Sequence, residues 1–433
     1  MGDAKKRVRA GDQDICPPPT KRKTTTSHAV ANFFTPTSQK PAEETSFHIV
    51  ENTLLVAKHG AIPPTPPAAS PVRIAAFDLD DALITTRSGR RFARDAEDWK
   101  WWDASVPTTL RRLADEGFLL AVLSNQAAVQ LKSPGPTRSR ELFQRKVAAV
   151  LRDLALPLRL YAATGADTFR KPRVGMWDRL LADSGLSAAD VDRAQSVFVG
   201  DAAGRQADAA RGARADHACS DRSLAANADI RFRTPDEFFR GEPPRPFLQP
   251  FEPTQHLTSA PRAAPSFHKR AAQELVLLCG RPGAGKSTFY RRTLAPQGYS
   301  RVNQDTLRTR ERCVQAAREQ LRRGASVAVD NTNADAATRA LWTAEARRAA
   351  VPVRLVLFTA GERVCEHNNV VRALGGVETN PEGRALVPPV AFRSFAARYC
   401  EPTVDEGFVD ITRVDFEFHG TAEERARWCR YWI

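Results

Sequence analysis

The fold of the second half of this 433-residue chain is decided by the stretch Leu275-Val276-Leu277-Leu278-Cys279-Gly280-Arg281-Pro282-Gly283-Ala284-Gly285-Lys286-Ser287-Thr288. Its first five residues form an uncharged apolar run, which is typical of a buried parallel strand. The Gly-x-x-x-x-Gly-Lys-Ser pattern that follows predicts a phosphate-binding loop leading into the N-terminus of a helix. We interpret the stretch as a nucleoside triphosphate site, in preference to a glycine turn that happens to carry a lysine.

The residues of this loop have separate roles in the predicted site. Gly280, Gly283 and Gly285 let backbone N–H groups approach an anion closely. Lys286 supplies a positive charge for the outer phosphates, and the hydroxyl of Ser287 can bind a nucleotide-bound Mg²⁺ ion. The predicted nucleotide-binding residues are Gly280, Gly283, Ala284, Gly285, Lys286, Ser287 and Thr288.

Length and composition indicate two globular domains. A chain of 433 residues with 42% hydrophobic residues exceeds one ordinary domain and can form two full cores. The 7 cysteines are scattered without a Cys-x-x-Cys pair, so we expect a reducing compartment and neither a disulfide nor a zinc framework. No apolar run has membrane-spanning length, and no secretory signal is expected. The net charge of +14 favours a polyanionic partner, although an arginine-rich composition alone would give the same balance.

The first 71 residues are rich in Pro, Thr, Ser and Lys and predict a disordered tail. Two basic clusters at 5–9 and 21–23 are spaced like a bipartite nuclear-import signal, which predicts a nuclear protein; ordinary solvated charge is the alternative. The adjacent Phe33 and Phe34 indicate a docking peptide. Their spacing is similar to that of a sliding-clamp-binding peptide, so a sliding clamp is an expected partner.

Strand and helix patterns alternate along the next part of the chain and predict an α/β domain with a parallel sheet over 72–240. One predicted strand ends on Asp78 and Asp80, a second on Ser124, and a third on Asp201. The carboxyl ends of parallel strands lie at the edge of the sheet where α/β proteins bind ligands. Residues 241–271 are rich in proline and polar residues and predict a linker, and residues 272–433 predict a second α/β domain.

Four features of the first domain resemble the haloacid-dehalogenase-like phosphatases: Asp78-Leu79-Asp80, Ser124, the Lys171-Pro172 turn and Gly200-Asp201. The resemblance implies that Asp78 is the nucleophile and Asp80 the general acid and base. It further implies that Ser124 and Lys171 hold the phosphoryl oxygens, and that Asp78, Asp80 and Asp201 bind Mg²⁺. A carboxylate nucleophile needs such a cation and such donors because it must approach a negatively charged phosphate.

One departure from that family lies beside the nucleophile. The family normally reads Asp-x-Asp-Gly-Thr, whereas this chain has Asp81 and Ala82 at the last two positions. A third carboxylate near the metal could repel the phosphate, and the threonine hydroxyl is missing. The sequence therefore predicts an active phosphatase of reduced rate.

In the second domain, Asp305 follows a predicted strand next to the phosphate loop. A carboxylate there can accept the proton of an attacking hydroxyl, although the same residue could cap the next helix. The run 330–333 could order the phosphate loop or the water around Mg²⁺. Arg372 is the predicted lid residue that stabilises the transferring phosphoryl group.

Taken in chain order, both sets of motifs closely resemble the eukaryotic bifunctional polynucleotide kinase 3′-phosphatases, over about residues 72–418. The stretches that carry this resemblance are Phe77-Asp78-Leu79-Asp80, residues 84–89, Arg170-Lys171-Pro172, residues 175–178, residues 199–205, residues 283–288, residues 330–333, His367-Asn368-Asn369 and residues 406–408.

This resemblance implies a haloacid-dehalogenase-like phosphatase domain followed by a P-loop kinase domain. It implies removal of 3′-phosphates and ATP-dependent phosphorylation of 5′-hydroxyls at DNA ends, with Asp305 as the kinase base and ATP and Mg²⁺ as cofactors. We expect a monomer that acts in DNA repair. The metazoan members carry an N-terminal phosphothreonine-binding module, which we do not expect ahead of residue 72.

Two other functions fit the same motifs. The phosphatase fold could be impaired and serve mainly to grip DNA ends while only the kinase turns over. Alternatively, a small-molecule kinase could be fused to an unrelated phosphatase. The basic charge and the pairing of the two domains favour DNA over a metabolite.

Overall fold

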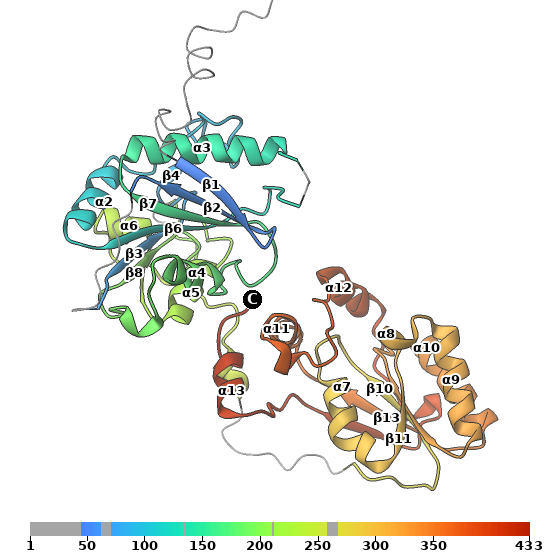
Figure 1. The fold of residues 1–433 in the computed structure, drawn as a ribbon. Coiled ribbons are helices and arrows are strands. Elements are labelled where there is room, and N and C mark those ends of the chain that lie inside the picture. Colours follow the sequence, from blue (N-terminus) through green and yellow to red (C-terminus); the bar gives the residue numbers. More distant parts are fainter. Residues whose placement is uncertain (1–44, 62–70, 133–134, 210–211, 258–266) are drawn as a thin grey trace, which may run out of the picture. The chain divides into compact units, whose positions relative to one another are not determined.

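The computed structural model describes residues 45–61, 71–132, 135–209, 212–257 and 267–433 (Figure 1). Two α/β domains follow one another along the described chain, each with its own sheet and hydrophobic cores. Among these residues, no helix combines the length and the apolarity needed to cross a membrane. The predicted α/β class is confirmed, because most strands in both sheets are parallel.

The first domain is built on a seven-stranded sheet with the order β1-β2-β7-β6-β3-β8-β9. The strands of this sheet are β1 (Thr45–Val50), β2 (Leu54–His59), β3 (Ile74–Phe77), β6 (Leu119–Asn125), β7 (Leu158–Ala163), β8 (Val197–Val199) and β9 (Arg231–Arg233). The five strands from β7 to β9 in this order run parallel, because helices cross over between them. A short hairpin of β4 (Ile84–Thr85) and β5 (Lys100–Trp101) lies outside the sheet.

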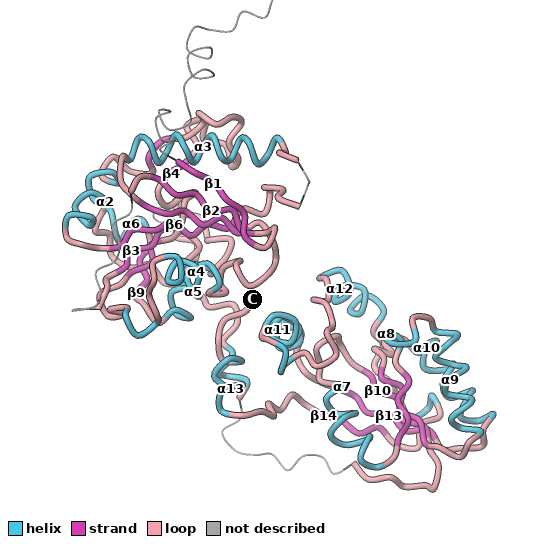
Figure 2. The backbone as a smooth tube through the Cα atoms, in the orientation of Figure 1, coloured by secondary structure: helices cyan, strands magenta, loops and turns pink. Residues whose placement is uncertain are grey.

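Helices cover both faces of this sheet (Figures 1 and 2). They are α2 (Val106–Asp115), α3 (Arg138–Leu154), α4 (Gly175–Asp183), α5 (Ser220–Ala228) and α6 (Pro235–Phe239). The core on one face contains α2 and α3, for example Leu110 and Phe143, and the core on the other contains α4 and α5, for example Met176 and Leu224. Every inward side chain of β3 is fully buried, so the strand that ends on Asp78 is rigidly held.

The expected tail is wrong for residues 45–59. Strand β1 pairs antiparallel with β2, and β2 pairs antiparallel with β7, so both belong to the phosphatase-like sheet and its boundary lies ahead of residue 72. The physical reason is the apolar run from Leu54 to Ala57, whose side chains are fully buried. Prolines and hydroxyl residues on both sides obscure this run in the composition.

The second domain has a fully parallel five-stranded sheet with the order β11-β12-β10-β13-β14. Its strands are β10 (Leu275–Cys279), β11 (Tyr299–Val302), β12 (Ser326–Asp330), β13 (Val353–Phe358) and β14 (Ile411–Val414). Strand β10, which leads into the glycine-rich loop, is central and completely buried, as its uncharged sequence predicts.

The helices of this domain are α7 (Lys286–Phe289), α8 (Gln304–Leu307), α9 (Arg310–Arg322), α10 (Ala336–Arg348), α11 (Glu362–Leu374), α12 (Pro389–Arg398) and α13 (Ala422–Trp428). Helix α7 continues into a π-helical turn at Tyr290–Leu294. A sharp turn separates α8 from α9. Arg308 has a positive φ of 74°, and Thr309 starts α9 by accepting a hydrogen bond from the Arg312 N–H.

Candidate active sites

Three carboxylates gather at the carboxyl ends of the neighbouring strands β3 and β8. Asp78 follows β3 and Asp201 follows β8, as the sequence predicts, and Asp221 joins them from the first turn of α5. One oxygen of each lies within 4.8 Å of the other two. Burial and the charge of Asp78 raise the pKa of Asp201 to about 8, and burial raises the pKa of Asp221 to about 6. Carboxylates this crowded suit a hard divalent cation such as Mg²⁺.

Asp221 is a site residue that the sequence reasoning missed. It is completely buried and accepts a hydrogen bond of 3.1 Å from the N–H of Ala202, next to Asp201. A local signal was present, because Asp221, Leu224, Ala225 and Ala228 share one face of α5, and the other three are apolar core residues. An acid on the apolar face of a helix requires a buried partner.

That partner is Lys171. Its Nζ lies 3.0 Å from Asp78 Oδ1 and 2.8 Å from Asp221 Oδ1, and the residue is 3% exposed. Burial acts to lower the pKa of Lys171, but the two carboxylates outweigh it and raise the pKa above its usual value. The turn is held by Asn125, whose amide accepts from the Lys171 N–H at 2.9 Å and donates to the Lys171 carbonyl at 3.2 Å. The end of β6 therefore fixes the lysine beside the nucleophile candidate.

Asp80 lies apart from the three-carboxylate cluster. Its Oδ1 is 2.9 Å from Lys146 Nζ on α3, and its Oδ2 accepts a 2.7 Å hydrogen bond from Gln126. Gln126 also donates to Ser124 Oγ at 3.0 Å, so Asp80 and Ser124 are joined through one side chain. Among the described residues the three-carboxylate cluster does not include the Asp80 carboxylate, and the expected role of Asp80 as a metal ligand stays a prediction. Its half-exposed position suits proton transfer.

The two residues that depart from the family pattern have different environments. Asp81 has a positive φ of 58°, the conformation in which glycine is common. Its exposed carboxylate accepts a 3.1 Å hydrogen bond from Thr85, and among the acids that raise the pKa of Asp201 it has the smallest effect. Ala82 is completely buried. These positions weaken the expectation that a third carboxylate repels the substrate.

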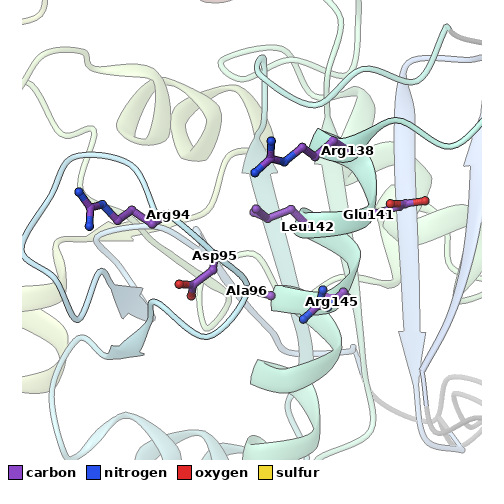
Figure 3. Close-up of a pocket in the computed structure, with 7 residues that line it drawn as sticks. All are labelled: Arg94, Asp95, Ala96, Arg138, Glu141, Leu142 and Arg145. Carbon is purple, nitrogen blue, oxygen red and sulfur yellow. The ribbon is translucent and has the colours of Figure 1, made fainter. Parts of the chain in front are cut away.

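A pocket lined by three arginines and two acids adjoins the helix that carries Lys146. A cavity of about 230 Å³ lies between residues 94–96 and α3. Its lining residues are Arg94, Asp95, Ala96, Arg138, Glu141, Leu142 and Arg145. Figure 3 shows Arg138 and Leu142 extending from α3 towards the loop with Asp95, whereas Glu141 points to the other side of the helix.

The glycine-rich loop of the second domain has the geometry that its sequence predicts. Gly283 and Gly285 have φ values of 77° and 96°, and a Cβ on Gly283 would lie 2.1 Å from the backbone oxygen of Cys365. Lys286 is buried and donates to the carbonyls of Gly280 and Arg281 at 2.9 and 2.6 Å. Burial lowers the pKa of Lys286. The loop residues thus fit the phosphates of a nucleotide.

Two runs of polar residues brace this loop. Asn333 donates to the Leu278 carbonyl at 2.9 Å, and the Gly280 N–H donates to the Thr332 carbonyl at 3.1 Å. On the other side, Asn368 donates to the Gly283 carbonyl at 3.0 Å and accepts from the indole of Trp428 at 2.7 Å. The expected ordering role of the run at 330–333 agrees with these contacts.

Asp305 lies in the first turn of α8, with its side chain 70% exposed. The helix cap is Asn303, whose Oδ1 accepts from the N–H groups of Asp305 and Thr306 at 2.9 and 3.3 Å. The capping role considered for Asp305 is therefore filled by its neighbour. The Asp305 carboxylate faces a different group, the guanidinium of Arg384, with Oδ2 and Nη1 3.2 Å apart.

Arg372, the predicted lid residue, binds the loop that carries Arg384. Its guanidinium donates to Asn369 Oδ1 at 2.9 Å and to the carbonyls of Arg384 and Ala385 at 3.3 and 3.1 Å. Burial lowers the pKa of Arg372, and the charge of Arg384 adds to this. Arg384 was missed because nothing in its local sequence indicates that its loop reaches Asp305.

Comparison with known proteins assigns the chain to a family. Residues 73–239 match the polynucleotide kinase 3 phosphatase family, and residues 275–316 and 308–387 match an AAA domain family. A bifunctional polynucleotide phosphatase/kinase of Schizosaccharomyces pombe is 38% identical over 373 residues, covering 85% of this chain and 84% of the relative. The polynucleotide 3′-phosphatase ZDP of Arabidopsis thaliana is 28% identical over 177 residues, which cover 39% of this chain and 24% of that protein. With the three-carboxylate site, the phosphate loop and this identity over most of its length, the chain belongs to the bifunctional polynucleotide phosphatase/kinase family.

Proposed function

We propose that this chain removes 3′-phosphates from DNA ends and phosphorylates their 5′-hydroxyls with ATP. The observation that carries the proposal is the presence in one chain of both the Asp78, Asp201 and Asp221 cluster and a phosphate loop followed by Asp305. The name of the S. pombe relative, a bifunctional polynucleotide phosphatase/kinase, supports it. Together the two reactions would prepare an end for ligation.

In the phosphatase reaction, a carboxylate oxygen of Asp78 attacks the phosphorus of the 3′-phosphate. The bond between phosphorus and the 3′-oxygen breaks, and Asp80 donates the proton that this oxygen takes up. Asp80 then removes a proton from the water that hydrolyses the aspartyl phosphate. Lys171 and Ser124 bind the phosphoryl oxygens. A Mg²⁺ ion held by Asp78, Asp201 and Asp221 would supply positive charge against the phosphate.

In the kinase reaction, Asp305 accepts the proton of the 5′-hydroxyl as its oxygen attacks the γ-phosphorus of ATP. The backbone N–H groups around Gly283 and the ammonium of Lys286 bind the phosphates. Arg372 remains the candidate for stabilising the transferred group. Mg²⁺ bound at Ser287 and the nucleotide would neutralise the charge that develops on the leaving oxygen.

The first domain offers cationic and aromatic side chains that suit a DNA strand. Arg138 and Arg145 line a pocket beside α3, the helix that carries Lys146, together with Arg94 and the acids Asp95 and Glu141. Arginine contacts to phosphates position a DNA strand without reading its sequence. Phe92 is 74% exposed, with the guanidinium of Arg91 5.6 Å from its ring centre. An exposed aromatic ring beside arginines offers a stacking face for a base.

The cellular part of the proposal is a nuclear, monomeric enzyme of DNA repair. The basic clusters at 5–9 and 21–23 and the pair Phe33 and Phe34 support nuclear import and a sliding-clamp partner. All of these lie outside the residues that the structure describes. Light scattering tests whether the protein is a monomer. A pull-down with a sliding clamp tests that partner, and the double variant Phe33→Ala with Phe34→Ala should lose the binding.

One experiment separates the activities. A 3′-phosphorylated, 5′-hydroxyl oligonucleotide is incubated with ATP and Mg²⁺, and both ends are followed for Asp78→Asn and Lys286→Ala. We expect Asp78→Asn to abolish phosphate release alone and Lys286→Ala to abolish phosphorylation alone, because each residue belongs to one site. Loss of both activities in either folded variant would contradict independent sites. Absence of both in the wild type would exclude the proposed function.

The second candidate is a 5′-kinase whose phosphatase domain mainly grips DNA. Asp81 motivates it, but its exposed carboxylate bonded to Thr85 favours the active phosphatase. The two are distinguished by the wild-type rate of 3′-phosphate release. A wild type that binds 3′-phosphorylated ends without releasing phosphate would favour the second candidate.

A further inference from the structure

The guanidinium of Arg384 lies between two carboxylates at the kinase site. Its Nη1 is 3.2 Å from Oδ2 of Asp305, and its Nη2 is 2.6 Å from Oε2 of Glu382. Arg384 belongs to the loop between α11 and α12, whereas Asp305 belongs to α8. The side chain of Asp305 is 70% exposed, but that of Arg384 is 25% exposed. Solvent therefore screens this ion pair less than it would screen a pair of two exposed side chains.

The backbone that carries Arg384 is held independently of the ion pair. Asn380 accepts from the Arg384 N–H at 2.9 Å and donates to the Arg384 carbonyl at 2.8 Å, and Arg372 donates to the same carbonyl. Glu382 is fixed in turn by Arg291 at 2.7 Å and Arg301 at 3.0 Å. The guanidinium is therefore presented to Asp305 from a braced loop.

An exposed aspartate samples several rotamers unless a partner holds it. Among the described residues, Arg384 is the cation in direct contact with Asp305, whereas Lys286 and Arg372 feel the charge of Asp305 without an ion pair. Because Arg384 engages Oδ2, it leaves Oδ1 free. A general base must have one oxygen within hydrogen-bond reach of the hydroxyl whose proton it accepts.

We propose that Arg384 is a positioning residue for the kinase reaction: it holds Oδ2 of Asp305 so that Oδ1 faces the 5′-hydroxyl of the substrate. The inference rests on the proposed kinase function. The proton passes from the 5′-oxygen to Oδ1, the bond from that oxygen to the γ-phosphorus forms, and the bond between the γ-phosphorus and the bridging oxygen of ADP breaks. Arg384 itself neither gives nor takes a proton.

The test measures 5′-phosphorylation by Arg384→Ala at saturating ATP over a range of oligonucleotide concentrations. We expect kcat to fall by about ten- to a hundredfold with KM for the oligonucleotide nearly unchanged, because a misplaced base impairs the step after binding. Arg384→Lys should recover part of the rate. Guanidinium ion at low concentration should restore part of the rate of Arg384→Ala, because it can occupy the space left beside Asp305.

Arg291→Ala is the matched control. It removes another arginine from Glu382 but does not touch Asp305, so it should lower kcat by less than about fivefold and gain nothing from guanidinium ion. In a double-mutant cycle, Arg384→Ala should cause no further loss of kcat when Asp305 is already replaced by asparagine, because the arginine acts through that carboxylate. Release of 3′-phosphate stays unchanged in every variant and reports that the first domain is folded, and an unchanged Tm reports that the kinase domain is folded.

Several results would overturn the proposal. Equal losses in Arg291→Ala and Arg384→Ala would make Arg384 a loop anchor only. A rise in KM with kcat unchanged would make it a contact to the DNA backbone, and a gain in rate would make it an inhibitory latch. An additive loss with Asp305→Asn would also refute it. Failure of the wild type to phosphorylate DNA would instead refute the kinase function on which the inference rests.

Discussion

Replacing Asp221 by asparagine tests whether the residue missed by the sequence reasoning supports the phosphatase site. Asparagine has the same shape and can still accept the hydrogen bond from the Ala202 N–H, but it carries no charge. Lys171 would then keep Asp78 as its one carboxylate partner, where it now has two, at 3.0 and 2.8 Å. The change therefore isolates the ionic contribution of Asp221.

The expected size follows from the burial of the pair, with Lys171 3% exposed and Asp221 fully buried. Removing one member of a buried ion pair costs about 3–5 kcal/mol, because the remaining charge is left without compensation. Since Lys171 retains Asp78, we expect the lower end, about 3 kcal/mol. For a domain of this size that corresponds to a fall in Tm of roughly 6–12 °C. Phosphate release should fall about a hundredfold, because Lys171 loses one of its two carboxylate partners and the proposed Mg²⁺ site loses one of its three charges.

The assay follows 3′-phosphate release, 5′-phosphorylation and Tm in one preparation. Phosphorylation should be unchanged below the Tm of the variant, which shows that the second domain is intact. The matched control is Asp229→Asn at the other end of α5, where the carboxylate is 79% exposed and pairs with Arg193 at 3.1 Å. It should leave rate and Tm unchanged. If Asp221→Asn released phosphate at the wild-type rate, the assignment of Asp221 to the site would be wrong.

Three further outcomes are expected. Burial lowers the pKa of His367 to about 4 in the folded protein, against about 6.5 when it is unfolded, so the unfolded state takes up the proton first as the pH falls. The free energy of unfolding, measured by urea titration, should therefore fall by up to about 3 kcal/mol from pH 6.5 to pH 4. The variant His367→Gln should reduce this dependence on pH. Asp81→Gly should change the rate of phosphate release by less than about threefold, because the Asp81 carboxylate is exposed; a tenfold faster release would show that Asp81 repels the substrate. Adding Ala82→Thr should lower the free energy of unfolding by about 1–3 kcal/mol, because the larger side chain overpacks a buried position. Affinity for DNA ends should fall steeply with salt, with a log–log slope of several units measured by fluorescence anisotropy, whereas a flat response would contradict an electrostatic interface.

The parts of the sites that could be predicted are those set by local sequence. The strand, glycine turn and helix at the phosphate loop are contiguous, so Gly283 and Lys286 could be placed from the pattern alone. Asp78 and Asp201 could be brought together because parallel strands present their carboxyl ends at one edge of the sheet. In each case a short segment and one general rule of α/β folds are sufficient.

The parts that could not be predicted depend on contacts between distant segments. Asp221 reaches Lys171 only because α5 packs on one face of the sheet, and Arg384 reaches Asp305 only through a loop held by Arg372. The partner of the Asp80 carboxylate, Lys146, lies on α3 and could not be predicted either. Spacing along the chain carries no information about such pairs.

Both proposed proton-transfer residues are organised in the same way. Asp80 and Asp305 each lie shortly after a strand, and each is substantially exposed. Each is held by a cation from a distant segment, Lys146 at 2.9 Å and Arg384 at 3.2 Å. The carboxylate must be exposed so that the end of a DNA strand can reach it. The cation limits the rotamers that this exposure would otherwise allow. The preceding β-strand fixes the backbone of the aspartate, but it leaves the side-chain torsions that orient the carboxylate oxygens unrestricted. The ordering of α3 and of the loop that carries Arg384 should therefore influence the rate of each reaction through the orientation of these acids.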